Sequence, residues 1–368
     1  MTHGLYRRAA FVTAAFFAIQ GSALAQGTAA GDLRQSYDLL SSTYYSTVEA
    51  QSLLDGARKG LIAEAQSHGL HITLPGLRVR GTDAENVAEV ASAIARAENL
   101  THESETQLTY AAISGMAKSL GDQYTAFFTP DEYQKFNDAL DPQKIVGIGV
   151  LIEPDPVTKY IRAYYVVPGT PADNAGIQAG DDFVAVDGKS TKGFTQDQAV
   201  KLLRGESGTT AHLQMQRPGQ PVQTLAVVRT NVQPPTVIFK MLPEQIGYIA
   251  ILTFGRETPD QFAQALDRLQ SQGVRAYVID LRNNGGGYVN SALDISAKFV
   301  NDDPLLTIEE RGSHTYTVQA PEDAVPRKPV TILVNRYTAS ASEITAGALQ
   351  DDGIGVLVGE RTFGKGVM

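Results

Sequence analysis

The chain has no cysteine and no tryptophan among its 368 residues, and it has only six histidines. The lack of cysteine excludes disulfide bonds, thiolate nucleophiles, iron–sulfur clusters and cysteine-ligated zinc. The few histidines leave little material for other metal sites. Basic residues are also outnumbered, because 31 Lys and Arg face 40 Asp and Glu, for a formal net charge of −9. That balance argues against a general nucleic-acid-binding protein, which needs a basic face.

Long apolar runs are absent as well: no stretch reaches the ~18 uninterrupted apolar residues of a membrane span. Hydrophobic residues nevertheless make up 43% of the chain and charged residues 19%. This composition can form a sizeable folded core and is unlike that of a disordered chain. The length suits two or three domains.

The N-terminus has the pattern of a secretory signal peptide. Arg7 and Arg8 precede a mainly apolar run over residues 9–19, and Ala23-Leu24-Ala25 follows. A basic region, a short apolar region and an A-x-A site predict cleavage after Ala25; a buried helix is the alternative interpretation. We therefore expect residues 1–25 to be removed and the mature protein to be periplasmic or secreted, without a stable membrane anchor.

The rest of the chain divides by the period of its apolar residues. Residues 26–138 predict helices, because apolar side chains recur at three-to-four spacing; residues 65–103 form an insertion whose 69–83 stretch reads as a loop. Residues 139–230 predict a β-rich domain, and residues 236–368 alternate strands and helices. The predicted fold class is therefore multidomain α+β. In its last part the expected strands and helices are Ile246–Leu252, Pro259–Gln272, Ala276–Leu281, Val289–Val300, Val330–Val334, Ser342–Leu349 and Ile354–Val358.

Four segments carry candidate chemistry. The first is Gly147-Ile148-Gly149-Val150, where glycines beside an apolar residue can turn backbone N–H groups toward a carboxylate. An adjoining strand edge could pair with an extended peptide, although a plain tight turn is the simpler interpretation. With Pro168-Gly169-Thr170-Pro171 and Val186-Asp187-Gly188 downstream, residues 145–230 resemble a PDZ domain. The resemblance implies that the glycine loop binds a peptide C-terminus and that Val150 and Ile152 line the groove.

The second and third segments each follow a predicted strand. Gly285-Gly286-Gly287 can be a phosphate loop, an oxyanion hole or a flexible turn. Ser340 and Glu343 fit a capping box, so a simple N-cap is one interpretation of Ser340. The same position also suits a nucleophile, because a serine at a strand-to-helix turn lies beside free N–H groups that can stabilise an oxyanion.

The fourth segment runs from Gly359 to Gly366 and contains the pattern G-x-x-x-x-G-K. A phosphate-binding P-loop needs Ser or Thr after the lysine, and Gly366 stands there. We therefore reject nucleotide binding for this segment, which leaves Lys365 as either a solvated lysine or a catalytic one.

Ser340 and Lys365 are 25 residues apart. Together with the glycine run and the PDZ-like segment, they make the chain similar to the carboxy-terminal processing proteases, serine peptidases of family S41. The resemblance covers about residues 106–368 and is most specific over the block from Ser340 to Lys365, with Thr362-Phe363-Gly364 inside it.

The resemblance implies that Ser340 is the nucleophile and Lys365 its general base, with the N–H groups of Ala341 and Gly286 as the oxyanion hole. Ser342 is the rival nucleophile. A lysine can act as a base only if burial lowers its pKa, and we expect Phe363 and its neighbouring glycines to supply a dry pocket. A Ser-His-Asp triad is a weaker alternative, because the one histidine in the α/β region, His314, is expected in a polar loop.

The implied function is a serine endopeptidase that recognises the apolar C-terminus of a protein or peptide substrate. No metal, organic cofactor or nucleic acid is implied, and no motif identifies an adaptor protein. The family also has a glutamine four residues after its lysine, which here would be position 369, and the family's protease core continues further. The alternative hypothesis is therefore a truncated, catalytically impaired homologue that binds C-terminal peptides; an unstable fragment with an exposed sheet edge is a third possibility.

Overall fold

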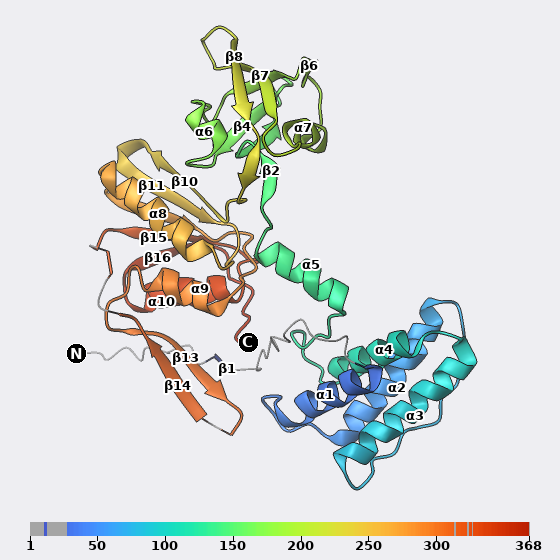
Figure 1. Cartoon of the computed structure of the whole chain (residues 1–368). Helices are drawn as coiled ribbons and strands as arrows, with labels where there is room; N and C mark the ends of the chain where they lie inside the picture. The colour runs from blue at the N-terminus through green and yellow to red at the C-terminus, as the bar shows by residue number, and fades with distance from the viewer. Residues whose placement is uncertain (1–10, 13–27, 313, 322–323, 326, 368) are drawn as a thin grey trace, which may run out of the picture. The chain divides into compact units, whose positions relative to one another are not determined.

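The computed structural model describes residues 11–12, 28–312, 314–321, 324–325 and 327–367 (Figure 1). Apart from Phe11–Val12, which form strand β1, the predicted signal peptide lies outside the described residues. The chain divides into two compact units: unit 1 comprises Met1–Phe136, Asp302–Glu322 and Gly364–Met368, and unit 2 comprises Asn137–Asn301 and Asp323–Phe363. Across the described ranges, none of the helices combines the length and the apolar character that a membrane span requires.

Four packed helices dominate unit 1, as the apolar spacing predicted (Figure 1). They are α1 (Ala29–Ser42), α2 (Ala50–Ser67), α3 (Asp83–Thr101) and α4 (Glu105–Lys118). Helices α2 and α4 cross closely, because the glycines Gly56, Gly60 and Gly115 leave no room for a Cβ at the crossing. Residues 70–82 contain no helix or strand, which agrees with the predicted loop. Helix α5 (Pro130–Leu140) follows and runs into unit 2.

Unit 1 also contains a β-hairpin that the sequence did not predict. Strands β13 (Pro304–Glu310) and β14 (His314–Gln319) pair antiparallel, and β1 pairs in parallel with β13. The expectation that His314 lies in a polar loop is therefore wrong, because this residue begins strand β14. Side chains along β14 are largely exposed, so the strand lacks the apolar alternation by which a half-buried strand is recognised.

The first part of unit 2, called here the β-rich part (residues 145–232), is an antiparallel assembly. Its main sheet has the order β3-β4-β5-β7-β8, with β6 paired to β5, and a separate pair joins β2 to β9. The strands are β2 (Ile145–Gly147), β3 (Val150–Pro154), β4 (Ile161–Val166), β5 (Asp182–Val186), β6 (Lys189–Ser190), β7 (Thr210–Gln216), β8 (Gln223–Val228) and β9 (Thr230–Val232). Helices α6 (Pro171–Asn174) and α7 (Gln196–Leu203) complete it, and the core centres on Ile161, Phe183 and Leu213.

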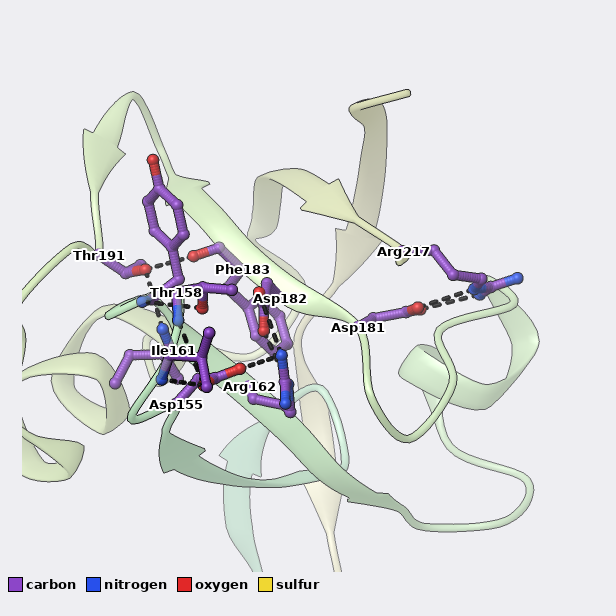
Figure 2. A network of polar contacts seen from close by, with 11 residues as sticks. Asp155, Thr158, Ile161, Arg162, Asp181, Asp182, Phe183, Thr191 and Arg217 are labelled. Atoms are coloured by element: carbon purple, nitrogen blue, oxygen red, sulfur yellow. Dashed lines mark hydrogen bonds and ion pairs between the residues drawn. The ribbon is translucent and has the colours of Figure 1, made fainter. Parts of the chain in front are cut away.

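A network of charged contacts supports the strands of the β-rich part (Figure 2). The guanidinium of Arg162 lies between Asp155 and Asp182, and Arg217 forms a bidentate pair with Asp181. Burial raises the pKa of Asp181, but the hydrogen bonds from Arg217 and from the N–H of Gln178, with the charge of Arg217, together outweigh it and hold that pKa below its usual range. Ion pairs therefore connect the loops of this part to its strands.

The second part of unit 2, the α/β part (residues 237–301 and 323–363), is built on a five-stranded sheet of order β10-β11-β12-β15-β16. The strands are β10 (Val237–Leu242), β11 (Ile246–Ile251), β12 (Ala276–Asp280), β15 (Val330–Val334) and β16 (Gly355–Gly359), and all pairs except β10–β11 are parallel. The helices are α8 (Thr258–Ser271), α9 (Val289–Ser296) and α10 (Ala341–Asp351), with a 3-10 turn at Pro243–Gln245.

Most of this arrangement agrees with the sequence-based prediction, and two points differ. Strand β10 was not predicted, and α9 ends at Ser296 rather than at Val300. The helix closes in a tighter turn, since the N–H of Lys298 donates to Ile295 and that of Phe299 to Ser296. Strands β12 and β15 are parallel neighbours, so the loops after their carboxyl ends lie side by side.

Candidate active site

Ser340 occupies a strained turn between β15 and α10. Its backbone angles are φ 55° and ψ −120°, whereas an ordinary helix N-cap has an extended backbone. A non-glycine residue in this conformation is costly and persists only when its surroundings impose it. Nucleophilic serines of hydrolases occupy the same kind of sharp strand-to-helix turn, which exposes the hydroxyl. The geometry therefore favours a site residue over a simple cap.

The capping box predicted from the sequence is also present. The carboxylate of Glu343 accepts the N–H of Ser340 at 2.8 Å, and the N–H of Glu343 donates to the Ser340 carbonyl at 2.7 Å. The other carboxylate oxygen accepts the hydroxyl of Thr362 at 2.7 Å, a contact that the sequence did not reveal. Glu343 thus connects the Ser340 turn to the segment that follows β16.

Gly286 lies directly against Ser340. A Cβ on Gly286 would stand 2.8 Å from the Ala339 carbonyl oxygen and 2.9 Å from the Ser340 Cβ, and its φ is 102°. Only glycine fits this position. The structure therefore brings together three of the predicted site residues: Ser340, Ala341 and Gly286.

The N–H groups around Ser340 differ in their partners. The N–H of Gly286, which the resemblance implied as an oxyanion donor, is engaged in this structure: it donates to the Oδ1 of Asn284 at 2.9 Å. Within the described residues, by contrast, no hydrogen bond engages the N–H of Gly285, Gly287 or Ala341. Ala341 is the first residue of α10, where unpaired N–H groups and the helix dipole favour a negative charge.

Ser342 is a poor alternative nucleophile. Its side chain is fully buried, and its hydroxyl donates to the carbonyl oxygen of Asn284 at 3.0 Å. A nucleophile must reach its substrate, so this burial argues for a structural role of Ser342.

Lys365 belongs to unit 1, where its ammonium lies 5.7 Å from the centre of the Tyr124 ring. Burial lowers the pKa of Lys365 from its ordinary value. The aromatic ring beside the ammonium is thus that of Tyr124, which the sequence did not connect with the lysine, whereas the Phe363 side chain is 51% exposed. A lysine with a lowered pKa can act as a base nearer neutral pH.

The β-rich part has a groove between β3 and α7 with a volume of about 170 Å³. Val150 and Ile152 from β3 line it, opposite Val200 and Leu203 from α7. At its end, no hydrogen bond within the described part of the chain engages the N–H of Ile148 or Gly149. An apolar groove that ends in free N–H groups can accept an apolar residue with a terminal carboxylate.

Two protein-family models match the chain, one over the α/β part and one over the β-rich part. Residues 245–368 match peptidase family S41, and residues 162–217 match the PDZ domain. Among curated relatives, a carboxyl-terminal-processing protease of Picosynechococcus sp. is 34% identical over 263 residues, which cover 70% of this chain and 63% of the relative. The carboxy-terminal processing protease CtpA of Bacillus subtilis is 33% identical over 265 residues, which cover 72% of this chain and 56% of the relative.

Among solved structures, a photosystem II D1 C-terminal processing protease is 29% identical with a TM-score of 0.39, and the match covers 87% of this chain and 83% of that one. The chain spans less than two thirds of the length of either curated relative. The comparisons confirm the resemblance predicted from the sequence: the chain carries a peptidase region of family S41 together with a PDZ domain, the combination of the carboxyl-terminal-processing proteases.

Proposed function

We propose that the protein is an exported serine endopeptidase that captures the C-terminus of a protein substrate and cleaves the chain with Ser340 and Lys365. One observation carries the proposal: Ser340 sits in a strained strand-to-helix turn, with Gly286 packed against it and the N–H of Ala341 unpaired among the described residues. A hydroxyl in such a turn lies beside donors that can hold a developing oxyanion.

The chemistry follows from these groups. The Oγ of Ser340 attacks the substrate carbonyl carbon while its proton passes to the neutral amine of Lys365. The N–H of Ala341 stabilises the negative oxygen of the tetrahedral intermediate, and Gly286 leaves room for that oxygen because it carries no side chain. The C–N bond then breaks, Lys365 returns the proton to the leaving amine, and water hydrolyses the acyl-enzyme by the reverse sequence.

The lowered pKa of Lys365 supports the role of base, because only its neutral form accepts a proton. Activity should therefore rise with pH as Lys365 loses its proton, and this rise should occur below the ordinary pKa of a lysine. Lys365→Met should abolish turnover at every pH, because no other group of the proposed dyad can accept the Ser340 proton.

Substrate capture belongs to the groove of the β-rich part, the PDZ domain. Its apolar walls and the unpaired N–H groups of Ile148 and Gly149, judged over the described residues, suit an apolar C-terminal residue with a free carboxylate. Capture would raise the local concentration of the tethered chain to the ~mM range. The signal-like pattern at residues 1–25 supports a periplasmic or secreted location.

The direct test is cleavage of an unfolded protein that has an apolar C-terminus, by the wild-type chain and by Ser340→Ala. Ser340→Ala should lower kcat at least ~10³-fold and leave the cooperative melt in place. Turnover that persists in this variant would refute the dyad. A substrate with an amidated C-terminus serves as the control for capture and should show a raised KM.

A non-catalytic peptide-binding protein is the second candidate, because both N–H groups and all lining residues of the groove except Pro234 and Pro235 lie in the β-rich part. Titration with a peptide and with its C-terminal amide separates the two candidates. Peptide binding without any Ser340-dependent turnover supports the binding protein.

A further inference from the structure

Asn284 is a buried polar residue at the edge of the Ser340 turn, and both the nitrogen and the oxygen of its side-chain amide make a hydrogen bond. The residue is 1% exposed. Its Nδ2 donates to the carbonyl oxygen of Ile251 at 2.7 Å, at the end of β11, and its Oδ1 accepts the N–H of Gly286 at 2.9 Å. One amide therefore ties the glycine turn to the central sheet.

The backbone of Asn284 contacts the other side of the same turn. Its carbonyl oxygen accepts the N–H of Ala339 at 3.1 Å and the hydroxyl of Ser342 at 3.0 Å. Ala339 directly precedes Ser340, and Ser342 follows it by two residues. Asn284 is thus bonded to Gly286, which packs against Ser340, and to the residues on both sides of Ser340.

We infer that Asn284 is a positioning residue of the active site, and that the Ser342 hydroxyl is its partner. The inference rests on the proposed function and adds two residues to it. Asn284 holds the peptide planes around Gly286 in one orientation, while Ser342 anchors the first turn of α10 to the Asn284 carbonyl. Together they set the distance between the glycine turn and the Ser340 turn.

A positioning group is required here because glycine itself is conformationally permissive. Gly285, Gly286 and Gly287 can populate many backbone conformations, and Gly286 and Gly287 have φ values of 102° and 150°. The Gly286 carbonyl accepts the N–H of Phe254 at 3.1 Å, which orients the peptide of Gly287, but the N–H of Gly286 is held by the Asn284 amide. A displacement of about 1 Å in a catalytic site can cost ~10²-fold in rate.

The neighbouring asparagine provides a matched control. Asn283 is exposed, and it exchanges hydrogen bonds with Asn335 at 3.0 Å and 2.9 Å. It has φ 61°, which glycine also adopts. Asn283→Gly therefore removes a side chain of the same type, one residue away, without touching Gly286 or Ser342.

The experiment measures kcat, KM and the rate at which a fluorophosphonate labels Ser340 in wild type, Asn284→Ala, Ser342→Ala and Asn283→Gly. We expect kcat and the labelling rate to fall ~10²-fold in Asn284→Ala and ~10-fold in Ser342→Ala, with KM unchanged. Asn283→Gly should stay within about twofold of wild type. The double variant Asn284→Ala/Ser342→Ala should lose less than the product of the two single losses, because the residues act as one unit.

Melting curves and peptide titration of the PDZ groove accompany these measurements. A role in positioning predicts a cooperative melt and unchanged peptide affinity in every variant that has lost kcat. Wild-type kcat and labelling in Asn284→Ala, or equal losses in Asn283→Gly, overturn the inference. If Asn284→Ala does not fold, Ser342→Ala decides, and wild-type kcat in that variant overturns the inference as well.

Ser340→Ala separates this inference from the function on which it rests. Turnover that survives in Ser340→Ala overturns the proposed function and the inference together. Turnover that is lost in Ser340→Ala but retained in Asn284→Ala overturns the inference alone.

Discussion

The two parts of unit 2 hold their loops in different ways. In the β-rich part, arginines paired with aspartates do so: Arg162 with Asp182, and Arg217 with Asp181 (Figure 2). Around Ser340 in the α/β part, most of the bonds are neutral and come from amides, hydroxyls and the backbone, as at Asn284 and Ser342.

This difference matches what each part is proposed to do. Ion pairs on a binding domain stabilise its frame and tolerate small changes in angle, and their strength depends on pH. Neutral hydrogen bonds between buried groups are directional, so they set orientations that do not change with pH in the working range. A site that must aim N–H groups at one oxygen gains more from the second kind of bond.

Among substitutions that should impair one part of unit 2 and leave the other intact, we expect the largest effect from Gly149→Ala, on peptide binding. The φ of Gly149 is 87°, and a Cβ there would collide with the side chain of Thr170. Gly149→Ala should lower affinity for a C-terminal peptide at least ~10-fold, because the carboxylate loop must move. Titration of the peptide checks this, with Gly147→Ala as control, since a Cβ on Gly147 meets no atom within 4 Å. Equal losses in both variants would contradict the account, as would a slower labelling of Ser340 in Gly149→Ala.

A smaller effect should follow from removing a buried charge of the β-rich part. Arg229 is 6% exposed; it donates to Asp187 at 2.8 Å and to the carbonyls of Leu202 and Leu203. Arg229→Met leaves these acceptors without their partner, which should cost about 2 kcal/mol of unfolding free energy at pH 7. Denaturant unfolding measures it.

The pH dependence of the free energy lost in Arg229→Met tests whether the ion pair with Asp187 causes the loss. Burial raises the pKa of Asp187, but the His212 N–H and Arg229 outweigh it and hold that pKa below its usual range. The pair therefore adds stability above the unfolded pKa of about 4, and the contribution is lost as the pH falls through the folded pKa. The difference in unfolding free energy between wild type and Arg229→Met should be smaller at pH 3 than at pH 7. A difference that does not change with pH would show that packing alone is responsible.

The smallest effect is the change in thermal stability that we expect from replacing Lys365. Because burial lowers its folded pKa, the unfolded chain binds more protons, and stability rises with pH up to the unfolded pKa. Lys365→Met should therefore melt about 2 °C above wild type at pH 7, with a smaller difference at pH 10. Thermal melts at the two pH values check the sign, and a variant that melts below wild type at pH 7 would contradict a destabilising burial of this lysine.

The sequence predicted the repeating pattern of the fold better than its irregular parts. The α/β strands and helices follow from runs of apolar residues, and β11, α8, β12 and β15 appear within one residue of their expected bounds. Strand β10 and the hairpin of β13 and β14 were missed. Lys240 interrupts the apolar pattern of the first, and the second exposes most of β14. Helix α9 was predicted too long because buried Phe299 and Val300 continue its apolar pattern beyond the last helical turn.

The residues of the candidate site were also predicted only in part from the sequence. The resemblance singled out Ser340, Ala341 and Gly286, which the fold brings together at the ends of neighbouring strands. Asn284 escaped notice because an asparagine before glycines has the pattern of an ordinary turn. Only its 1% exposure and its bonds to other segments distinguish it from exposed Asn283. Contacts made across the fold leave no trace in local spacing.

The measurement that tests the central claim most directly is labelling with a fluorophosphonate, followed by mass spectrometry of the modified peptide. The account predicts one modified residue, Ser340, with labelling abolished in Ser340→Ala and retained, though slower, in Ser342→Ala. Modification of Ser342 in the wild type, or no modification of a chain that melts cooperatively, would contradict it.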